Sequence, residues 1–290
     1  MENGYLVLTA AAGVPDEVVK KVGDALAEPA PAPHRLGGRS VEIPVPAGAD
    51  PARQIELARS LAVDCNFVSG VRRKKSVLIA DMDSTIVPVE CIDELADFAG
   101  LREEVAAITE QAMRGDIGFE GALRARVRLL EGLPTSAMAR CFEERISLNP
   151  GARELVRTMA ATGATAALVS GGFTYFTERV ARAAGFAINQ ANRLIVADGR
   201  LTGEVAEPIL GRAAKLAALR RLCRDRDVGF DEALAVGDGA NDLAMIETAG
   251  LGVAFRAKPA LRARAAAVLD HSDLTALLAL QGYSEAEYSD

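Results

Sequence analysis

The sequence predicts an α/β protein with a doubly wound parallel sheet, a helical cap inserted after the first strand of that sheet, and a small α+β unit at the N-terminus. Four short apolar segments, at 76–80, 165–169, 232–236 and 252–254, end in polar or glycine-rich turns that lead into helical patterns. Strands that alternate with helices form parallel sheets covered on both faces. Residues 90–148 interrupt this alternation with a helical period and charged faces, which predicts the cap.

The chain divides into a predicted N-terminal unit, 1–71, and a core with its cap, 72–290. The expected elements of the first unit are strands at 5–9, 40–46 and 65–71 and helices at 15–27 and 51–62, with a proline-rich connector at 29–33. This βαβ-type order resembles a degenerate ACT-like regulatory domain. A structural or dimerising role is an equal alternative, and we expect the chain to be compatible with a homodimer.

Composition excludes several classes of function. The formal charge of −7 disfavours a nucleic-acid surface, and the one dense basic run, 72–75, flanks an apolar strand. No uninterrupted apolar run reaches the ~18 residues of a membrane span, so we expect no membrane partner. The four cysteines are scattered without a CxxC pair, which favours reduced thiols in the cytoplasm over a disulfide framework or a zinc site.

Two acidic clusters follow predicted core strands. Asp81 and Asp83 come directly after the strand at 76–80, and Asp238 and Asp242 follow the strand at 232–236. Ligands of parallel sheets collect at the carboxyl ends of the strands, so both clusters are expected at one edge. Four carboxylates there would repel by about 4 kcal/mol per pair at ~4 Å and an effective dielectric of 20. The charges therefore imply a cation, and oxygen-only ligands favour Mg²⁺.

Two further segments could bind a phosphate group at the same edge. The strand at 165–169 ends in Ser170-Gly171-Gly172, where a hydroxyl and exposed amides could hold phosphate oxygens at a helix N-terminus. Lys215 lies on a predicted helix at 212–223, shortly before the second acidic strand. Each feature alone is more often a simple turn or a solvated lysine, but next to two acidic clusters both become candidate phosphate ligands.

With these motifs in order, the chain resembles the haloacid dehalogenase superfamily of phosphatases, and the resemblance covers residues 76 to about 283. The matching motifs are Asp81-x-Asp83-Ser-Thr85, Ser170-Gly171, Lys215 and Gly237-Asp238-Gly-x-Asn241-Asp242. The longer stretches 83–90, 112–127 and 191–203 are similar to the phosphoserine phosphatase branch. The resemblance implies a Rossmann-like core, Mg²⁺, and hydrolysis of O-phosphoserine to serine and phosphate, the last step of serine biosynthesis.

The resemblance also implies roles for individual residues. Asp81 would be the nucleophile and Asp83 the general acid and base. Asp81, the backbone carbonyl of Asp83, and Asp238 would hold Mg²⁺, with Asp242 supporting the metal site from behind. The implied phosphate ligands are Ser170, Gly171 and Lys215, with Asn241 orienting the phosphate.

In the cap, the resemblance assigns Glu90 to the substrate ammonium and Arg126 to its carboxylate, with Met113 and Phe119 closing over the small side chain. An arginine can grip a carboxylate through two parallel hydrogen bonds. The sequence alone does not select Arg126, because it stands in a series with Arg124 and Arg128.

Three alternatives stay open at the level of the sequence. An enzyme of the same fold could hydrolyse another small phosphomonoester, such as phosphohomoserine, or transfer the phosphoryl group to an alcohol. A non-catalytic phosphoserine sensor could use the same pocket. A dehalogenase is disfavoured, because that branch requires neither the second acid at position 83 nor Mg²⁺.

Overall fold

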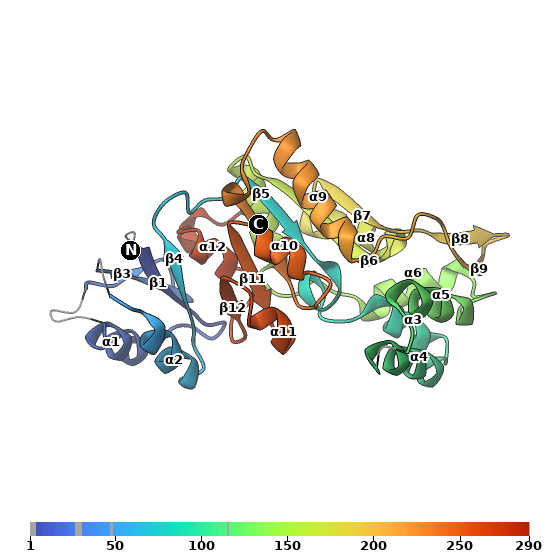
Figure 1. Cartoon of the computed structure of the whole chain (residues 1–290), viewed down its shortest axis with the longest axis horizontal. Helices are drawn as coiled ribbons and strands as arrows, with labels where there is room; N and C mark the ends of the chain where they lie inside the picture. Colours follow the sequence, from blue (N-terminus) through green and yellow to red (C-terminus); the bar gives the residue numbers. More distant parts are fainter. Residues whose placement is uncertain (1–3, 27–30, 47–48, 115, 290) are drawn as a thin grey trace.

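The computed structural model describes residues 4–26, 31–46, 49–114 and 116–289, and within α4 the side chains of 112–114 lie outside the description. The start of the predicted proline-rich connector, at 29–30, also lies outside it. Two sheets follow one another along the long axis of the molecule, and the cap helices lie at the far end from the N-terminal sheet (Figure 1). Among the described residues, no helix has the length and apolar character needed to cross a bilayer.

The core is a six-stranded sheet in which every neighbouring pair is parallel, as predicted. Its strands, in spatial order, are β12 (Ala267–Leu269), β11 (Leu251–Phe255), β10 (Ala233–Gly237), β5 (Val77–Ala80), β6 (Thr165–Phe173) and β7 (Ile188–Asn192). The four strands expected from apolar segments are present. The two edge strands were not predicted, because β12 has only three residues and β7 carries three polar ones.

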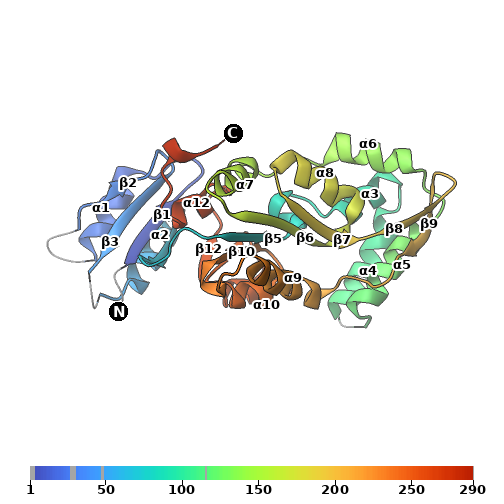
Figure 2. The ribbon, with the colours of Figure 1, turned by 90° about the horizontal axis from the view of Figure 1, so that it is seen from above.

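Both faces of this sheet are buried, which is why its strands read as continuous apolar runs. Alternate residues of β5 divide between two clusters: Leu78 packs toward α7 (Ala152–Ala161) and α8 (Thr174–Ala184), and Ile79 toward the opposite face. That second face is covered by α9 (Arg212–Asp225), α10 (Leu243–Thr248) and the short α11 (Pro259–Arg262). Figure 2 shows α7 and α8 on one side of the sheet and α9 and α10 on the other. The doubly wound arrangement is confirmed.

Four helices form the cap between β5 and β6, as the helical period predicted. They are α3 (Cys91–Phe98), α4 (Arg102–Arg114), α5 (Phe119–Leu129) and α6 (Thr135–Arg145). An unpredicted hairpin, β8 (Leu194–Ala197) and β9 (Arg200–Val205), lies beside α5 and α6 (Figure 2). The amide of Gly132 donates to the carbonyl of Leu201 at 2.8 Å, so a segment that follows β7 in sequence completes the cap in space.

The N-terminal sheet has the order β2-β3-β1-β4, and each of its pairs is antiparallel. Its elements are β1 (Gly4–Thr9), α1 (Asp16–Asp24), β2 (His34–Arg35), β3 (Ser40–Val45), α2 (Ala52–Ser60) and β4 (Asp64–Ser69). The predicted strands and helices are present, and β1 lies between β3 and β4 and runs antiparallel to both. Apolar residues of one face of β1 cluster with α1 and α2.

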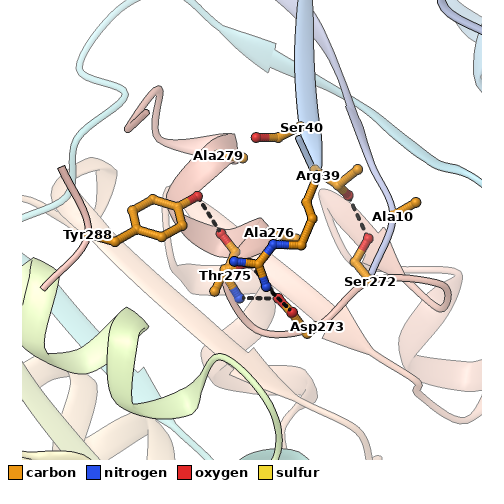
Figure 3. Close-up of a pocket in the computed structure, with 10 residues that line it drawn as sticks. Ala10, Arg39, Ser40, Ser272, Asp273, Thr275, Ala276, Ala279 and Tyr288 are labelled. Atoms are coloured by element: carbon orange, nitrogen blue, oxygen red, sulfur yellow. Dashed lines mark hydrogen bonds and ion pairs between the residues drawn. The ribbon is translucent and has the colours of Figure 1, made fainter. Parts of the chain in front are cut away.

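The opposite face of this sheet lies against α12 (Ala276–Leu280) and the C-terminal residues. Figure 3 shows the polar contacts at this junction. Arg39 pairs with Asp273 at 2.8 Å, and the hydroxyls of Thr9 and Ser272 lie 2.7 Å apart. Both contacts join residues more than 200 positions apart in sequence.

Side chains of β4 also form hydrogen bonds with the backbone groups at the outer edge of the core sheet, on β12. The amide of Asn66 accepts a hydrogen bond from the N–H of Val268 at 2.8 Å and donates to the carbonyl of Val268 at 3.0 Å. The buried carboxylate of Asp64 accepts from the N–H groups of Asp270 and His271, each at 2.9 Å, and from the hydroxyl of Ser272 at 2.7 Å. At this edge, side-chain groups therefore form the hydrogen bonds that the backbone of a neighbouring strand would form.

Replacing Asp64 with alanine is expected to lower the free energy of unfolding by about 3 kcal/mol, because two backbone amides and the buried hydroxyl of Ser272 lose their acceptor. Urea denaturation measures this loss. The control is Asp24→Ala at an exposed position of α1, which is expected to change stability by less than about 0.5 kcal/mol. Equal effects of the two substitutions would contradict the role given to Asp64.

Candidate active site

The predicted motif residues meet at the carboxyl edge of the core sheet. Asp81 follows β5, Asp238 follows β10, and Ser170 lies near the end of β6. Lys215 reaches the same edge from the first turn of α9. The convergence expected from strands ending at one edge is therefore present in the structure.

Asp81 is the centre of the arrangement and is only 4 % exposed. One carboxylate oxygen accepts from the N–H of Met82 at 2.7 Å and lies 2.7 Å from the ammonium of Lys215. The other oxygen lies 3.5 Å from the side-chain amide of Asn241. These contacts fix the orientation of the Asp81 carboxylate.

Lys215 is buried between Asp81 and Asp242, whose carboxylate oxygen lies 2.5 Å from the lysine ammonium. Burial opposes the charge of Lys215, but the two carboxylates outweigh it and raise the pKa of the lysine above its ordinary value. Asp242 can turn back toward Lys215 because Gly237 has no side chain: a Cβ there would lie 2.4 Å from Cγ of Asp242. Lys215 is therefore a fixed positive charge next to Asp81.

Oxygens of Asp81, Asp238 and Asp242 lie within 4.8 Å of one another. Burial and the neighbouring charge of Asp81 raise the pKa of Asp238 to about 6 and that of Asp242 to about 7. The raised pKa values show that the nearby lysines do not fully neutralise the negative charge of these carboxylates. A hard divalent cation, which takes oxygen ligands, fits this donor set.

Asp83 lies two residues after Asp81, in the segment Met82–Ile86. Its backbone is extended, and Ser84 with φ +57° turns the chain away. The carboxylate accepts from the hydroxyl of Ser170 at 3.0 Å and from the N–H of Cys91 at 2.8 Å. Burial, followed by the charges of Glu90 and Asp81, raises the pKa of Asp83 to about 7. A carboxyl group with that pKa can both give and take a proton near neutral pH.

The Ser170-Gly171-Gly172 segment lies within β6 rather than in a turn after it, because β6 continues to Phe173 before α8 begins. The expectation that these residues stand at a helix N-terminus was wrong, because α8 begins only at Thr174, four residues after Ser170. The hydroxyl of Ser170 accepts from the N–H of Gly172 at 2.8 Å, and a Cβ on Gly172 would lie 3.0 Å from the carboxylate of Asp83. The glycine thus allows Asp83 to approach the strand.

A pocket of about 210 Å³ opens between this edge and the cap. Its charged and polar lining residues from the core are Asp81, Asp83, Ser170, Asp238, Asn241 and Lys258, and those from the cap are Glu90 and Arg126. Apolar parts of the wall come from Ile92, Phe119, Leu123 and Phe173. The pocket therefore brings together three predicted phosphate-site residues, Ser170, Gly171 and Asn241, and three of the four predicted cap residues, whereas Lys215 lies behind Asp81 and does not line it.

Glu90 stands at the start of α3 and accepts from the hydroxyl of Ser84 at 2.9 Å. Burial and the charges of Asp81 and Asp93 raise its pKa. Arg126 lies on α5, half-buried, with its guanidinium near the carbonyl of Ala122 at 3.4 Å. Glu90 and Arg126 thus present opposite charges to one small pocket.

The two other predicted cap residues lie on α5 and α4. Phe119 begins α5 and is 44 % exposed, with its ring against the backbone of Gly171. Met113 belongs to α4, but its side chain lies outside the described part of the structure.

Sequence reasoning missed three residues of this site. Asn192, at the end of β7, donates to the carbonyl of Gly171 at 2.8 Å and accepts from the N–H of Leu210 at 2.7 Å. Cys91 supplies the amide that holds Asp83, and Lys258 lines the pocket from the segment after β11. Lys258 could have been found by including every residue that follows a core strand, since it stands three positions after Phe255.

A model of the haloacid dehalogenase-like hydrolase family matches residues 78–247, more than half of the chain. The chain belongs to this family. The match begins within β5 and ends in α10, so it contains both acidic clusters, the cap and Lys215. The resemblance drawn from the motifs is confirmed at the level of the family.

Family relatives with curated names are similar over most of the chain. A phosphoserine phosphatase of Archaeoglobus fulgidus is 46% identical over 67% of the chain, and the alignment spans 56% of that protein. A phosphoserine phosphatase of Albidiferax ferrireducens is 44% identical over 74% of the chain and 93% of its own length. The chain thus spans about half the length of the first of these relatives and nearly all of the second.

A solved structure extends the likeness to the N-terminal sheet. The family hydrolase of Salmonella enterica subsp. enterica serovar Typhi has a TM-score of 0.87 at 27% identity, covering 97% of this chain and 98% of its own. The N-terminal unit and the core therefore occur together, in a similar arrangement, in another member of the family.

Proposed function

We propose that this chain is a Mg²⁺-dependent phosphatase that hydrolyses O-phospho-L-serine to serine and phosphate through an aspartyl-phosphate intermediate, in serine biosynthesis. The observation that carries the proposal is one small pocket lined by Asp81, Glu90 and Arg126, with the ammonium of Lys215 2.7 Å from the carboxylate of Asp81. The names of the similar relatives support the same substrate.

In the first step, an oxygen of Asp81 bonds to phosphorus as the bond from phosphorus to the serine oxygen breaks. Asp83 gives its proton to that leaving oxygen. In the second step, a water attacks the same phosphorus, Asp83 takes a proton from it, and the carboxylate of Asp81 is released with phosphate. Lys215 neutralises charge on the phosphoryl oxygens, Ser170 and Gly171 bind them, and Asn241 orients the group.

Asp81, the backbone carbonyl of Asp83, and Asp238 would hold Mg²⁺, with Asp242 supporting the site from behind. The ion supplies, when bound, neutralisation of the phosphate charge. The fit rests on the donor set, which contains only oxygens, and on the crowded carboxylates of Asp81, Asp238 and Asp242.

Chelation of divalent ions is expected to abolish phosphate release, and Mg²⁺ is expected to restore it. Ca²⁺ should inhibit, because the larger ion accepts more oxygens and could engage both oxygens of Asp81, removing the lone pair needed for attack. Phosphate release after dialysis against EDTA measures activity. Thermal unfolding with added Mg²⁺ measures binding independently, since an ion that binds the folded state raises Tm. Full activity after exhaustive chelation would contradict the metal requirement.

The substrate assignment rests on the two ends of the pocket. Glu90 would bind the ammonium and Arg126 the carboxylate of the amino acid, while Phe119 and Met113 close over its side chain. The pocket of about 210 Å³ offers Glu90 and Arg126 to the two charged ends of an amino acid, and a sugar phosphate has neither of these ends.

Steady-state hydrolysis of a panel of phosphomonoesters tests this assignment. Phosphoserine is expected to have the highest kcat/KM, and phosphohomoserine, with one more methylene, to fall at least about tenfold below it. Sugar phosphates should fall lower still, since they carry neither the ammonium nor the carboxylate. A flat profile across the panel would reduce the proposal to a general small-molecule phosphatase. Binding of phosphoserine without turnover would favour a sensor.

We further propose that residues 1–71 form a small ACT-like domain with a regulatory or dimerising role, and that 72–290 form the phosphatase domain with its cap at about 90–148. The antiparallel sheet with two helices on one face supports the assignment of a separate, ACT-like N-terminal domain. The four cysteine thiols are buried and free, which agrees with a reducing compartment such as the cytoplasm.

A further inference from the structure

Lys258 stands at the mouth of the pocket and is held there by its backbone. Its N–H donates to the carbonyl of Asp238 at 2.9 Å, and it forms the N-cap of α11, with Pro259 at the first helical position. Proline fixes its own φ and is well suited to that position. The start of α11 is therefore tied to the residue that would bind the metal, while the Lys258 side chain remains exposed and lines the pocket.

Lys258 shares the pocket with carboxylates from two different elements. Asp238 follows β10 and Glu90 stands at the start of α3, and both line the pocket together with Lys258.

Lys258 differs from Lys215 in its availability. The ammonium of Lys215 is already engaged by Asp81 at 2.7 Å and Asp242 at 2.5 Å. Lys258 belongs to no ion pair within the described ranges of the chain, although four lining residues carry carboxylates: Asp81, Asp83, Glu90 and Asp238. A phosphate dianion that enters past these acids needs a positive charge at the mouth.

We propose that Lys258 binds the phosphoryl group of the substrate from the exposed side of the pocket. The inference rests on the proposed phosphatase function and adds a phosphate ligand to it. The phosphoryl end is favoured over the carboxylate end because Lys258 is anchored to Asp238, whose carboxylate lies within 4.8 Å of those of Asp81 and Asp242. A lysine ammonium is also a compact point charge suited to phosphate, whereas a carboxylate is matched by the fork of Arg126.

The test compares Lys258→Ala, Lys258→Arg and the control Lys20→Ala, an exposed lysine of α1. Loss of a charged hydrogen bond to phosphate is expected to raise KM about tenfold in Lys258→Ala, for both phosphoserine and p-nitrophenyl phosphate, with kcat changing less than about threefold. The dissociation constant of inorganic phosphate, measured by calorimetry with Mg²⁺ present, should rise by the same factor. Lys258→Arg should recover most of the loss, and Lys20→Ala should match the wild type.

Three results would overturn the proposal. A loss confined to phosphoserine would assign Lys258 to the substrate carboxylate. A weaker Mg²⁺ dependence with unchanged phosphate affinity would make Lys258 a support of the metal site only. Unchanged constants for all ligands would leave it outside the site. Failure of the phosphoserine assignment can be told apart from failure of the Lys258 proposal. The first would show as low activity of the wild type on phosphoserine, while p-nitrophenyl phosphate and inorganic phosphate would still test the role of Lys258.

Discussion

Asp81→Asn is expected to lower kcat for phosphoserine by about four orders of magnitude or more, because an amide oxygen cannot replace the attacking carboxylate. The fold should persist, since the substitution keeps the shape of the side chain and its contact with the N–H of Met82. Phosphate release measures the loss, and circular dichroism with thermal unfolding checks the fold. Beryllofluoride with Mg²⁺ should modify the wild type at Asp81 and leave the variant unmodified.

The matched control for this substitution is Asp225→Asn, at the exposed end of α9, which should retain full activity. Mass spectrometry excludes deamidation of the new asparagine back to aspartate. Substantial turnover by a variant shown to be intact asparagine would refute the assignment of Asp81 as the nucleophile.

Arg126→Ala is expected to reduce kcat/KM for phosphoserine by about 2–4 kcal/mol, roughly 30-fold to 900-fold, because the substrate carboxylate is left in the pocket without its partner. Hydrolysis of p-nitrophenyl phosphate should change less than about threefold, since that substrate has no carboxylate. The ratio of the two losses is the quantity to measure, because it separates recognition of the amino acid from recognition of phosphate.

The same helix offers the control. Arg124 lies two positions earlier on α5, is exposed and pairs with Glu207 outside the pocket. Arg124→Ala should therefore leave both substrates within about twofold of the wild type. Equal losses on both substrates in Arg126→Ala would mean that Arg126 supports the cap or the phosphate, and the phosphoserine assignment would fall.

The core of this site was predictable because its residues follow strands. A parallel sheet collects the ends of its strands at one edge, so the positions of Asp81, Ser170 and Asp238 follow from apolar segments alone. Lys215 became a candidate only through the two acidic clusters, since nothing in its helix distinguishes it from a solvated lysine. Arg126 required the resemblance: residues two apart on a helix point in nearly opposite directions, but the sequence does not say which direction faces the pocket.

Contacts between distant segments could not be predicted from local patterns. The amide of Cys91 that holds Asp83, and the side chain of Asn192 that holds Gly171, act through backbone groups whose positions depend on the finished fold. The strand β12 was missed for a related reason. It has three residues, and its outer side is satisfied by Asn66, 202 positions away. A short segment with a distant partner leaves no periodic signal.

The hydrogen bonds between Asn66 and β12 affect how the protein behaves in solution. An exposed edge strand offers unpaired N–H and C=O groups to any other chain with a free edge, and such pairing leads to aggregation. At β12 those groups are occupied by Asn66, and the turn after it by Asp64. Side chains cannot extend a ladder as a backbone does, so the sheet ends there. The N-terminal unit therefore protects the phosphatase core against intermolecular strand addition at this edge.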